Sequence, residues 1–130
     1  MHEFDIIKKY FSKLSLKNKN SINLNDDVFF DRSKKLVISV DTYIDKSHFF
    51  DFKDPDLVIK KILRSSISDL ICKGVKPKYY FISGSGNKKT FTKSNLKRIS
   101  RSLRQDKKVW NSYFGWRYCL SNKLSFTIIS

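Results

Sequence analysis

Hydrophobic positions between residues 54 and 74 recur at steps of three and four, which is the spacing of a helix with one buried face. Asp54 and Pro55 suit its start, because Asp can cap the first turn and Pro is tolerated at the first helical position. Gly74 and Pro77 favour its end. The inner stripe of this predicted helix consists of Ile59, Ile62, Leu63, Ile67, Leu70 and Ile71, with the small residue Ser66 among them.

Two further segments have helical spacing. The first covers residues 3–14 and places apolar side chains at Phe4, Ile7, Phe11 and Leu14. The second follows a cap at Thr90 or Thr92 and covers residues 93–104. Its predicted inner side chains are Leu96, Ile99 and Leu103, and its outer ones are Lys93, Lys97, Arg98, Arg101 and Arg104.

Four segments have the alternation or the composition of strands, namely residues 28–30, 36–44, 78–83 and 124–129. Residues 22–25 are expected to begin a short strand that leads into the first of them. Helices and strands do not alternate strictly, and the chain contains no repeat and no internal boundary. We therefore predict an α+β fold, residues 1–130 forming a single domain with a mixed or antiparallel sheet and helices packed on one face.

The strand over residues 36–44 carries polar groups in its middle. Ser39 and Asp41 point to the same side, because side chains alternate along a strand. The acidic pair Asp26-Asp27 precedes this strand, and Asp69 lies at the border of the apolar stripe on the helix that follows. Asp is disfavoured in strands, which favours a function for Asp41 over simple solvation of an exposed face. Three carboxylate sources that can converge indicate a site for a hard cation and a phosphate.

The net charge of +15 over 130 residues has two interpretations. It is typical of proteins that bind nucleic acid or anionic membranes. It also follows from A/T-rich codons, which raise the Lys content without selecting a basic site, and the charges are scattered along the sequence. No apolar segment has the length of a membrane span or a signal region. Cys72 and Cys119 have no partners at metal-ligand spacing, so we expect a reduced, cytoplasmic setting.

The order of several short motifs resembles the N-terminal half of bacterial thiamine-monophosphate kinases, which belong to the superfamily of aminoimidazole ribonucleotide synthetase and selenophosphate synthetase. The motifs are Glu3-Phe4-Asp5-Ile6-Ile7 with Tyr10-Phe11, Asp26-Asp27, Ser39-Val40-Asp41-Thr42 with His48-Phe49, Asp54-Pro55, and Ser68-Asp69-Leu70 with Lys73-Gly74 and Pro77. The resemblance implies the N-terminal-domain fold of that superfamily, and it is clearest over residues 3–83.

The resemblance implies transfer of the ATP γ-phosphoryl group to thiamine monophosphate, with Mg²⁺ as the metal. Such transfer needs positioning and charge neutralisation more than covalent help from the protein. The implied metal ligands are Asp27, Ser39, Asp41 and Asp69, with Asp26 in support and Val40 offering its backbone carbonyl. His48 is implied to contact thiamine monophosphate. No residue is assigned as a catalytic group or as an ATP ligand. The family also implies a homodimer that pairs across the sheets. From the residues themselves we expect no membrane partner, and nucleic acid is the less favoured partner.

The sequence departs from the family at Gly115-Trp116-Arg117-Tyr118, where the family has Gly-Gly-Asp-Thr and its Asp is a metal ligand. With suitable synonymous codons, frame shifts near Lys108 and Leu120 would restore a hydrophobic strand and this motif; the alternative is a diverged loop. Asn25 replaces a Gly, and Ser65-Ser66 replaces Val-Asn, which removes an amide. The family's C-terminal half is also missing from residues 1–130, so we expect little or no kinase activity from this chain alone.

Two other functions remain open. A small nucleic-acid-binding module would use the basic helix over residues 93–104, but it leaves the acidic clusters unexplained. A sister ATP-dependent enzyme of the same superfamily would act on another substrate. The Glu3-Phe4 start and the Asp41-Thr42 and His48-Phe49 motifs favour the thiamine branch.

Overall fold

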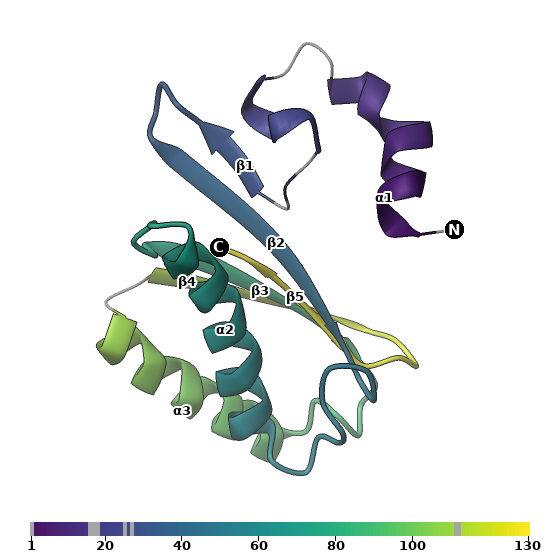
Figure 1. Cartoon of the computed structure of the whole chain (residues 1–130). Helices are drawn as coiled ribbons and strands as arrows, with labels where there is room; N and C mark the ends of the chain where they lie inside the picture. Colours follow the sequence, from purple (N-terminus) through teal and green to yellow (C-terminus); the bar gives the residue numbers. More distant parts are fainter. Residues whose placement is uncertain (1, 16–18, 25, 27, 111–112) are drawn as a thin grey trace. The chain divides into compact units, whose positions relative to one another are not determined.

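The structure is a computed structural model, and it describes residues 2–15, 19–24, 26, 28–110 and 113–130 (Figure 1). The chain divides into two compact units, residues 1–39 and residues 40–130. Each unit is described by itself, and the expectation of a single domain over residues 1–130 stays a prediction. None of the helices within the described residues is long and apolar enough to cross a membrane.

The first unit begins with a helical run that confirms the helix predicted over residues 3–14. It consists of α1 (Glu3–Ile6), a π-helical turn η1 (Ile7–Phe11) and a 3₁₀ turn η2 (Ser12–Ser15). Another 3₁₀ helix, η3 (Lys19–Leu24), follows, so the strand expected to begin at Ile22 is wrong. Ser and Asn favour local turn structure over a strand ladder, and this segment is rich in both.

A hairpin completes the first unit. Strand β1 (Val28–Asp31) pairs antiparallel with the first part of β2 (Leu36–Ile44), in register from Val28 opposite Ser39 to Asp31 opposite Leu36. The Asp31 carboxylate accepts hydrogen bonds from the Ser33 hydroxyl at 2.7 Å and from the Ser33 backbone N–H at 3.0 Å. The hydroxyl bond is the largest cause of the lowered pKa of Asp31. These bonds hold the turn between the two strands.

The second unit is a mixed sheet covered by two helices. The last part of β2 pairs antiparallel with β5 (Ser125–Ile129), β5 pairs antiparallel with β3 (Tyr79–Gly86), and β3 pairs in parallel with β4 (Tyr113–Leu120). Helices α2 (Pro55–Cys72) and α3 (Lys93–Trp110) lie on the same face of this sheet (Figure 1). The predicted α+β class and the placement of the helices on one face are confirmed.

The core of the second unit lies between the sheet and these helices. Phe126 of β5 is fully buried, with the rings of Phe49, Phe52, Phe91 and Trp116 between 5.6 and 6.4 Å from its own. The predicted inner stripe of α2 is buried except for Ile71, which is exposed. At 3.6 residues per turn Ile71 is rotated about 120° from Ile59, which takes it beyond the edge of the sheet-facing side.

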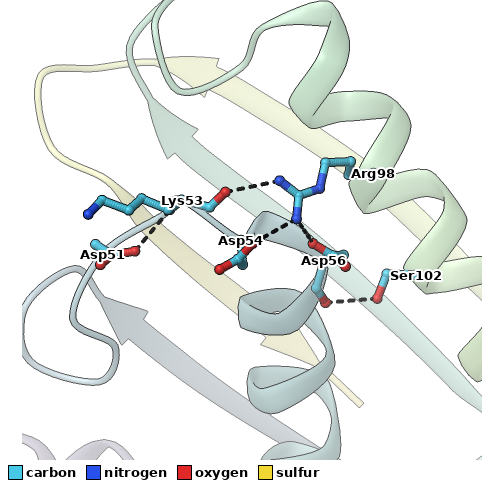
Figure 2. A network of polar contacts seen from close by, with 6 residues as sticks. All are labelled: Asp51, Lys53, Asp54, Asp56, Arg98 and Ser102. Atoms are coloured by element: carbon cyan, nitrogen blue, oxygen red, sulfur yellow. Dashed lines mark hydrogen bonds and ion pairs between the residues drawn. The ribbon is translucent and has the colours of Figure 1, made fainter.

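Polar contacts join the start of α2 to α3 (Figure 2). The Arg98 guanidinium donates hydrogen bonds to the Asp54 carboxylate at 2.9 Å and to the Asp56 carboxylate. It also donates to the Lys53 carbonyl at 3.0 Å. The bond with Asp54 is the largest cause of the raised pKa of Arg98. Ser102 of α3 donates to the Asp56 carbonyl at 3.0 Å. Asp54 therefore occupies the N-cap position as predicted, but its side chain binds Arg98 and makes no capping bond.

Truncating Phe126 to Ala is expected to destabilise the protein by about 3–5 kcal/mol, because the fully buried ring would leave a cavity among four aromatic neighbours. Denaturant unfolding followed by circular dichroism measures the change. Phe50 provides the matched control, since its side chain is 96% exposed and Phe50→Ala should change stability by less than about 0.5 kcal/mol. Equal losses in the two variants would contradict the described core.

Candidate functional site

The two faces of β2 differ in burial, and the polar groups lie on the more buried one. Ser39 is 1% exposed and Asp41 is half-buried, whereas Val40 and Ile44 on the opposite face are exposed. The Ser39 hydroxyl and one carboxylate oxygen of Asp41 are buried and have no hydrogen-bond partner within the part of the chain that the structure describes. An unpaired buried oxygen is costly, and ligation of a cation is one way to satisfy it. Simple solvation therefore does not explain these two side chains.

Tyr43 brings together groups from β2 and α2. Its side chain is hydrogen-bonded to the Ser65 side chain, and the charges of Asp41 and Asp69 both act on its hydroxyl. Burial is the largest cause of the raised pKa of Tyr43; the two carboxylates raise it further, whereas the bond with Ser65 lowers it. Asp41 and Asp69, which are 28 positions apart in the sequence, thus act on one phenol.

His48 lies beside the same tyrosine. Its Nδ1 accepts a hydrogen bond from the Ile44 backbone N–H at 2.9 Å, which leaves the proton on Nε2 as an available donor. Its ring lies edge-on to Tyr43, with the ring centroids 5.7 Å apart. Lys61 of α2 donates to the His48 carbonyl at 2.8 Å, and the adjacent Phe49 is buried in the core. The loop therefore holds an exposed imidazole in a defined orientation beside Tyr43.

The remaining candidate ligands are less well placed by the structure. Asp26 is exposed, and Asp27 lies outside the described residues. Val40 can contribute only its backbone carbonyl, because its side chain is on the opposite face of β2 from Asp41. Among the described residues, which leave out Asp27, no group of three or more His, Cys, Asp or Glu side chains is close enough to hold a metal ion. The complete ligand set stays a prediction.

Neither Tyr43 nor Ser65 was predicted from the sequence to belong to this site. Two signals were present: Tyr43 shares a strand face with Asp41, and Ser65 stands one helical turn before Asp69. The neighbouring Ser66 is fully buried, and its hydroxyl is 3.1 Å from that of Ser130 just after β5. The position that lacks the family's amide thus has a hydroxyl contact to the end of the sheet.

The segment with the altered family motif forms the strand β4, so the alternative of a diverged loop is wrong for residues 113–120. Gly115 lies opposite Phe81 of β3, whose ring packs so closely over it that an added Cβ would force the ring to move. Arg117 is exposed. A cavity of about 420 Å³ on this part of the sheet is lined by Phe81, Ile82, Ser83, Gly115, Trp116, Arg117, Thr127 and Ile129. The nucleotide sequence remains the test of the frame-shift hypothesis.

One protein-family model matches the part of the chain that contains the acidic motifs. The family described as AIR synthase related protein, N-terminal domain, matches residues 24–111. The chain belongs to this family. The match includes both acidic segments, the strand with Ser39 and Asp41, and α2 with Asp69.

Among characterised relatives, thiamine-monophosphate kinases are similar to this chain. The protein of Haemophilus influenzae is 31% identical over 83 residues, covering 61% of this chain and 25% of that protein. The protein of Buchnera aphidicola subsp. Schizaphis graminum is 31% identical over 110 residues, covering 77% of this chain and 34% of that protein. The chain therefore spans about a quarter to a third of the length of these relatives.

Solved structures support the fold. Thiamine monophosphate kinase from Aquifex aeolicus is 22% identical, with a TM-score of 0.77 over 98% of this chain and 39% of that chain. AaThiL complexed with AMPPCP and TMP is 23% identical, with a TM-score of 0.79 over 98% of this chain and 40% of that chain. The HypE-HypF complex is 16% identical, with a TM-score of 0.65 over 95% of this chain and 40% of that chain. The fold of the family's N-terminal domain is thereby confirmed.

The raised pKa of Tyr43 predicts a stability change at alkaline pH. The folded state holds the phenolic proton more tightly than the unfolded state does. The contribution of this proton to the stability of the fold is therefore fully present below pH 10.0, and it is lost as the pH rises above that value. Tyr43→Phe should remove this part of the alkaline loss, measured by urea unfolding at several pH values from 8 upward. Tyr79→Phe is the control, because it removes the same hydroxyl from a tyrosine whose side chain is half-exposed. An unchanged alkaline profile in Tyr43→Phe would contradict the placement of its hydroxyl.

Proposed function

We propose that this chain is the N-terminal, metal- and nucleotide-binding part of an ATP-dependent thiamine-monophosphate kinase. The observation that carries the proposal is the placement of Asp41, Asp69 and His48 around Tyr43. The named activity of the relatives and the AMPPCP and TMP bound to AaThiL support it. ATP is the proposed phosphoryl donor, and thiamine monophosphate is the proposed acceptor.

The carboxylates fit Mg²⁺, which prefers oxygen ligands and shares them with substrate phosphates. The buried, unpaired oxygens of Asp41 and Ser39 agree with a cation at this face of β2. We infer that Asp27, Ser39, Asp41 and Asp69 hold the metal, with Asp26 in support and the Val40 carbonyl as a further donor. When bound, Mg²⁺ supplies charge neutralisation for the nucleotide's phosphates.

The protein's own part is to orient the two substrates. The His48 Nε2–H is the donor that we assign to the phosphate of thiamine monophosphate, since Nδ1 is engaged by the Ile44 backbone N–H. We infer that Tyr43 and Ser65 help to orient this site, because the phenol is hydrogen-bonded to Ser65, lies edge-on to His48 and is acted on by the charges of Asp41 and Asp69. Positioning of this kind is the main contribution that a protein makes to phosphoryl transfer.

The complete reaction is proposed for the whole protein, because the relatives are three to four times as long as the part of them that this chain matches. For residues 1–130 alone we expect metal and nucleotide binding with little turnover. Arg117 stands where the family has a ligand carboxylate, and this change should lower turnover further, because a cation there repels the metal. A cytoplasmic location agrees with the two free thiols of Cys72 and Cys119.

Metal binding tests this proposal directly. Electron paramagnetic resonance of Mn²⁺ titrated into the protein with ATP should show binding, and Asp41→Asn and Asp69→Asn should each weaken it at least tenfold, since each removes a charged ligand. Asp5→Asn makes the same change of charge on α1 and should leave the affinity unchanged. A transfer assay with thiamine monophosphate should detect little product. Equal Mn²⁺ affinity in all three variants would refute the site, and turnover with another acceptor would favour a sister enzyme of the family.

We also propose a homodimer formed through the outer face of the second unit's sheet. This face exposes apolar side chains from three strands, namely Val40 and Ile44 of β2, Ile129 of β5, and Tyr79 and Phe81 of β3. Thr42 and Thr127, whose hydroxyls are 3.2 Å apart, lie between them. Contiguous apolar surface of this kind marks an interface, and a second copy of the same sheet matches its character.

The dimer is tested by analytical ultracentrifugation. The unaltered chain should sediment as a dimer at micromolar concentration, and Phe81→Asp should give monomers because it places a charge in the interface. Phe50→Asp introduces the same charge at an exposed phenylalanine outside this face and should stay dimeric. A monomeric unaltered chain would overturn the proposed assembly.

A further inference from the structure

Basic residues of α3 form a continuous stripe on the outer side of the helix. The stripe consists of Lys93, Lys97, Arg101, Arg104 and Lys108, all exposed. At 3.6 residues per turn and 1.5 Å per residue, these five side chains fall within about 80° of the helix circumference and span about 22 Å of its length. None of them forms an ion pair with a carboxylate among the described residues.

The acidic side chains near α3 are already neutralised on other sides of the helix. Asp54 and Asp56 bind Arg98. Asp106, the one acidic residue of α3, is 1% exposed and lies 3.2 Å from Arg64 of α2. The field outside the stripe is therefore positive along its length. A/T-rich codons would raise the number of lysines in the chain, but they would not sort the charges of α3 in this way.

An apolar groove with aromatic walls adjoins the stripe. A cavity of about 370 Å³ between α3 and β4 is lined by Leu96, Ile99, Ser100, Leu103, Trp116 and Tyr118. It shares Leu96 and Ser100 with an open hollow of about 620 Å³ whose other lining residues are Lys93, Lys97, Arg101 and Arg104 of the stripe. Tyr118 is 49% exposed, and its ring is supported from behind by Phe91 with centroids 5.2 Å apart.

We propose that this surface binds single-stranded nucleic acid. The phosphates lie along the stripe, and an unpaired base enters the groove and stacks on Tyr118. A positive track beside aromatic side chains is the combination that single strands use, because every base has a face that stacks. Duplexes satisfy the stripe but not the groove, since their bases are already stacked on one another. This binding uses other residues than the carboxylate site and does not depend on it.

The test uses fluorescence anisotropy of a labelled 12-nucleotide oligouridine added to the full chain. Binding should weaken as salt rises, since about three phosphate contacts on a single strand give a log–log slope of roughly −2. Lys97→Glu, Arg101→Glu and Arg104→Glu combined should lower the affinity more than tenfold and flatten this slope. Lys76→Glu, Lys88→Glu and Lys89→Glu combined, all at exposed positions, carry the same change of charge and should lower it less than threefold. Circular dichroism confirms folding of both variants.

A second variant separates stacking from charge. Tyr118→Ala should weaken oligouridine binding several-fold without changing the salt slope, and Tyr118→Phe should bind like the unaltered chain. The proposal is overturned by absence of binding at 50 mM salt or by equal losses in the two triple variants, which would mean that net charge alone acts. It is likewise overturned if a duplex of the same length binds as tightly, or if anionic vesicles bind and the oligonucleotide does not.

Discussion

The second unit depends on the insertion of the last strand, β5, between β2 and β3. Its pairing with both neighbours is antiparallel, and its inward residues Phe126 and Ile128 are fully buried at the centre of the core. Because β5 follows β2 by some eighty residues, this closure requires contacts between distant parts of the chain. Because β5 occupies one edge of β3, β4 pairs with the other edge of β3, and β2 pairs with the free edge of β5.

The candidate site is a consequence of how β2 is covered. The side of β2 that carries Asp41 and Tyr43 is the more buried one, so a carboxylate and a phenol are held at the border of the core and not in open solvent. Helix α2 then presents Ser65 and Asp69 to the same phenol. A partly buried setting strengthens electrostatic interactions, which suits the proposed task of neutralising and orienting phosphates.

Negative and positive side chains occupy different sides of the second unit. The charges of Asp41 and Asp69 act on the phenol of Tyr43, whereas the carboxylates of Asp54, Asp56 and Asp106 near α3 are paired with Arg98 or Arg64. The pairs join α2 to α3 and leave the outer side of α3 uniformly positive. The same two helices therefore build the core, present a carboxylate to the site and carry a basic surface, with each function on a different side.

The sequence by itself determined the α+β class, the three helical segments and the positions of four strands along the chain, because these follow from local periodicity and caps. It also pointed to Asp41, Asp69 and His48 through short motifs. Only the tertiary structure decided that the polar side of β2 is the buried one and that Tyr43 and Ser65 belong with the carboxylates. It also decided that Asp54 binds Arg98 and that residues 113–120 form a strand beside β3. These features depend on which distant segments pack together, and local patterns contain no information about that.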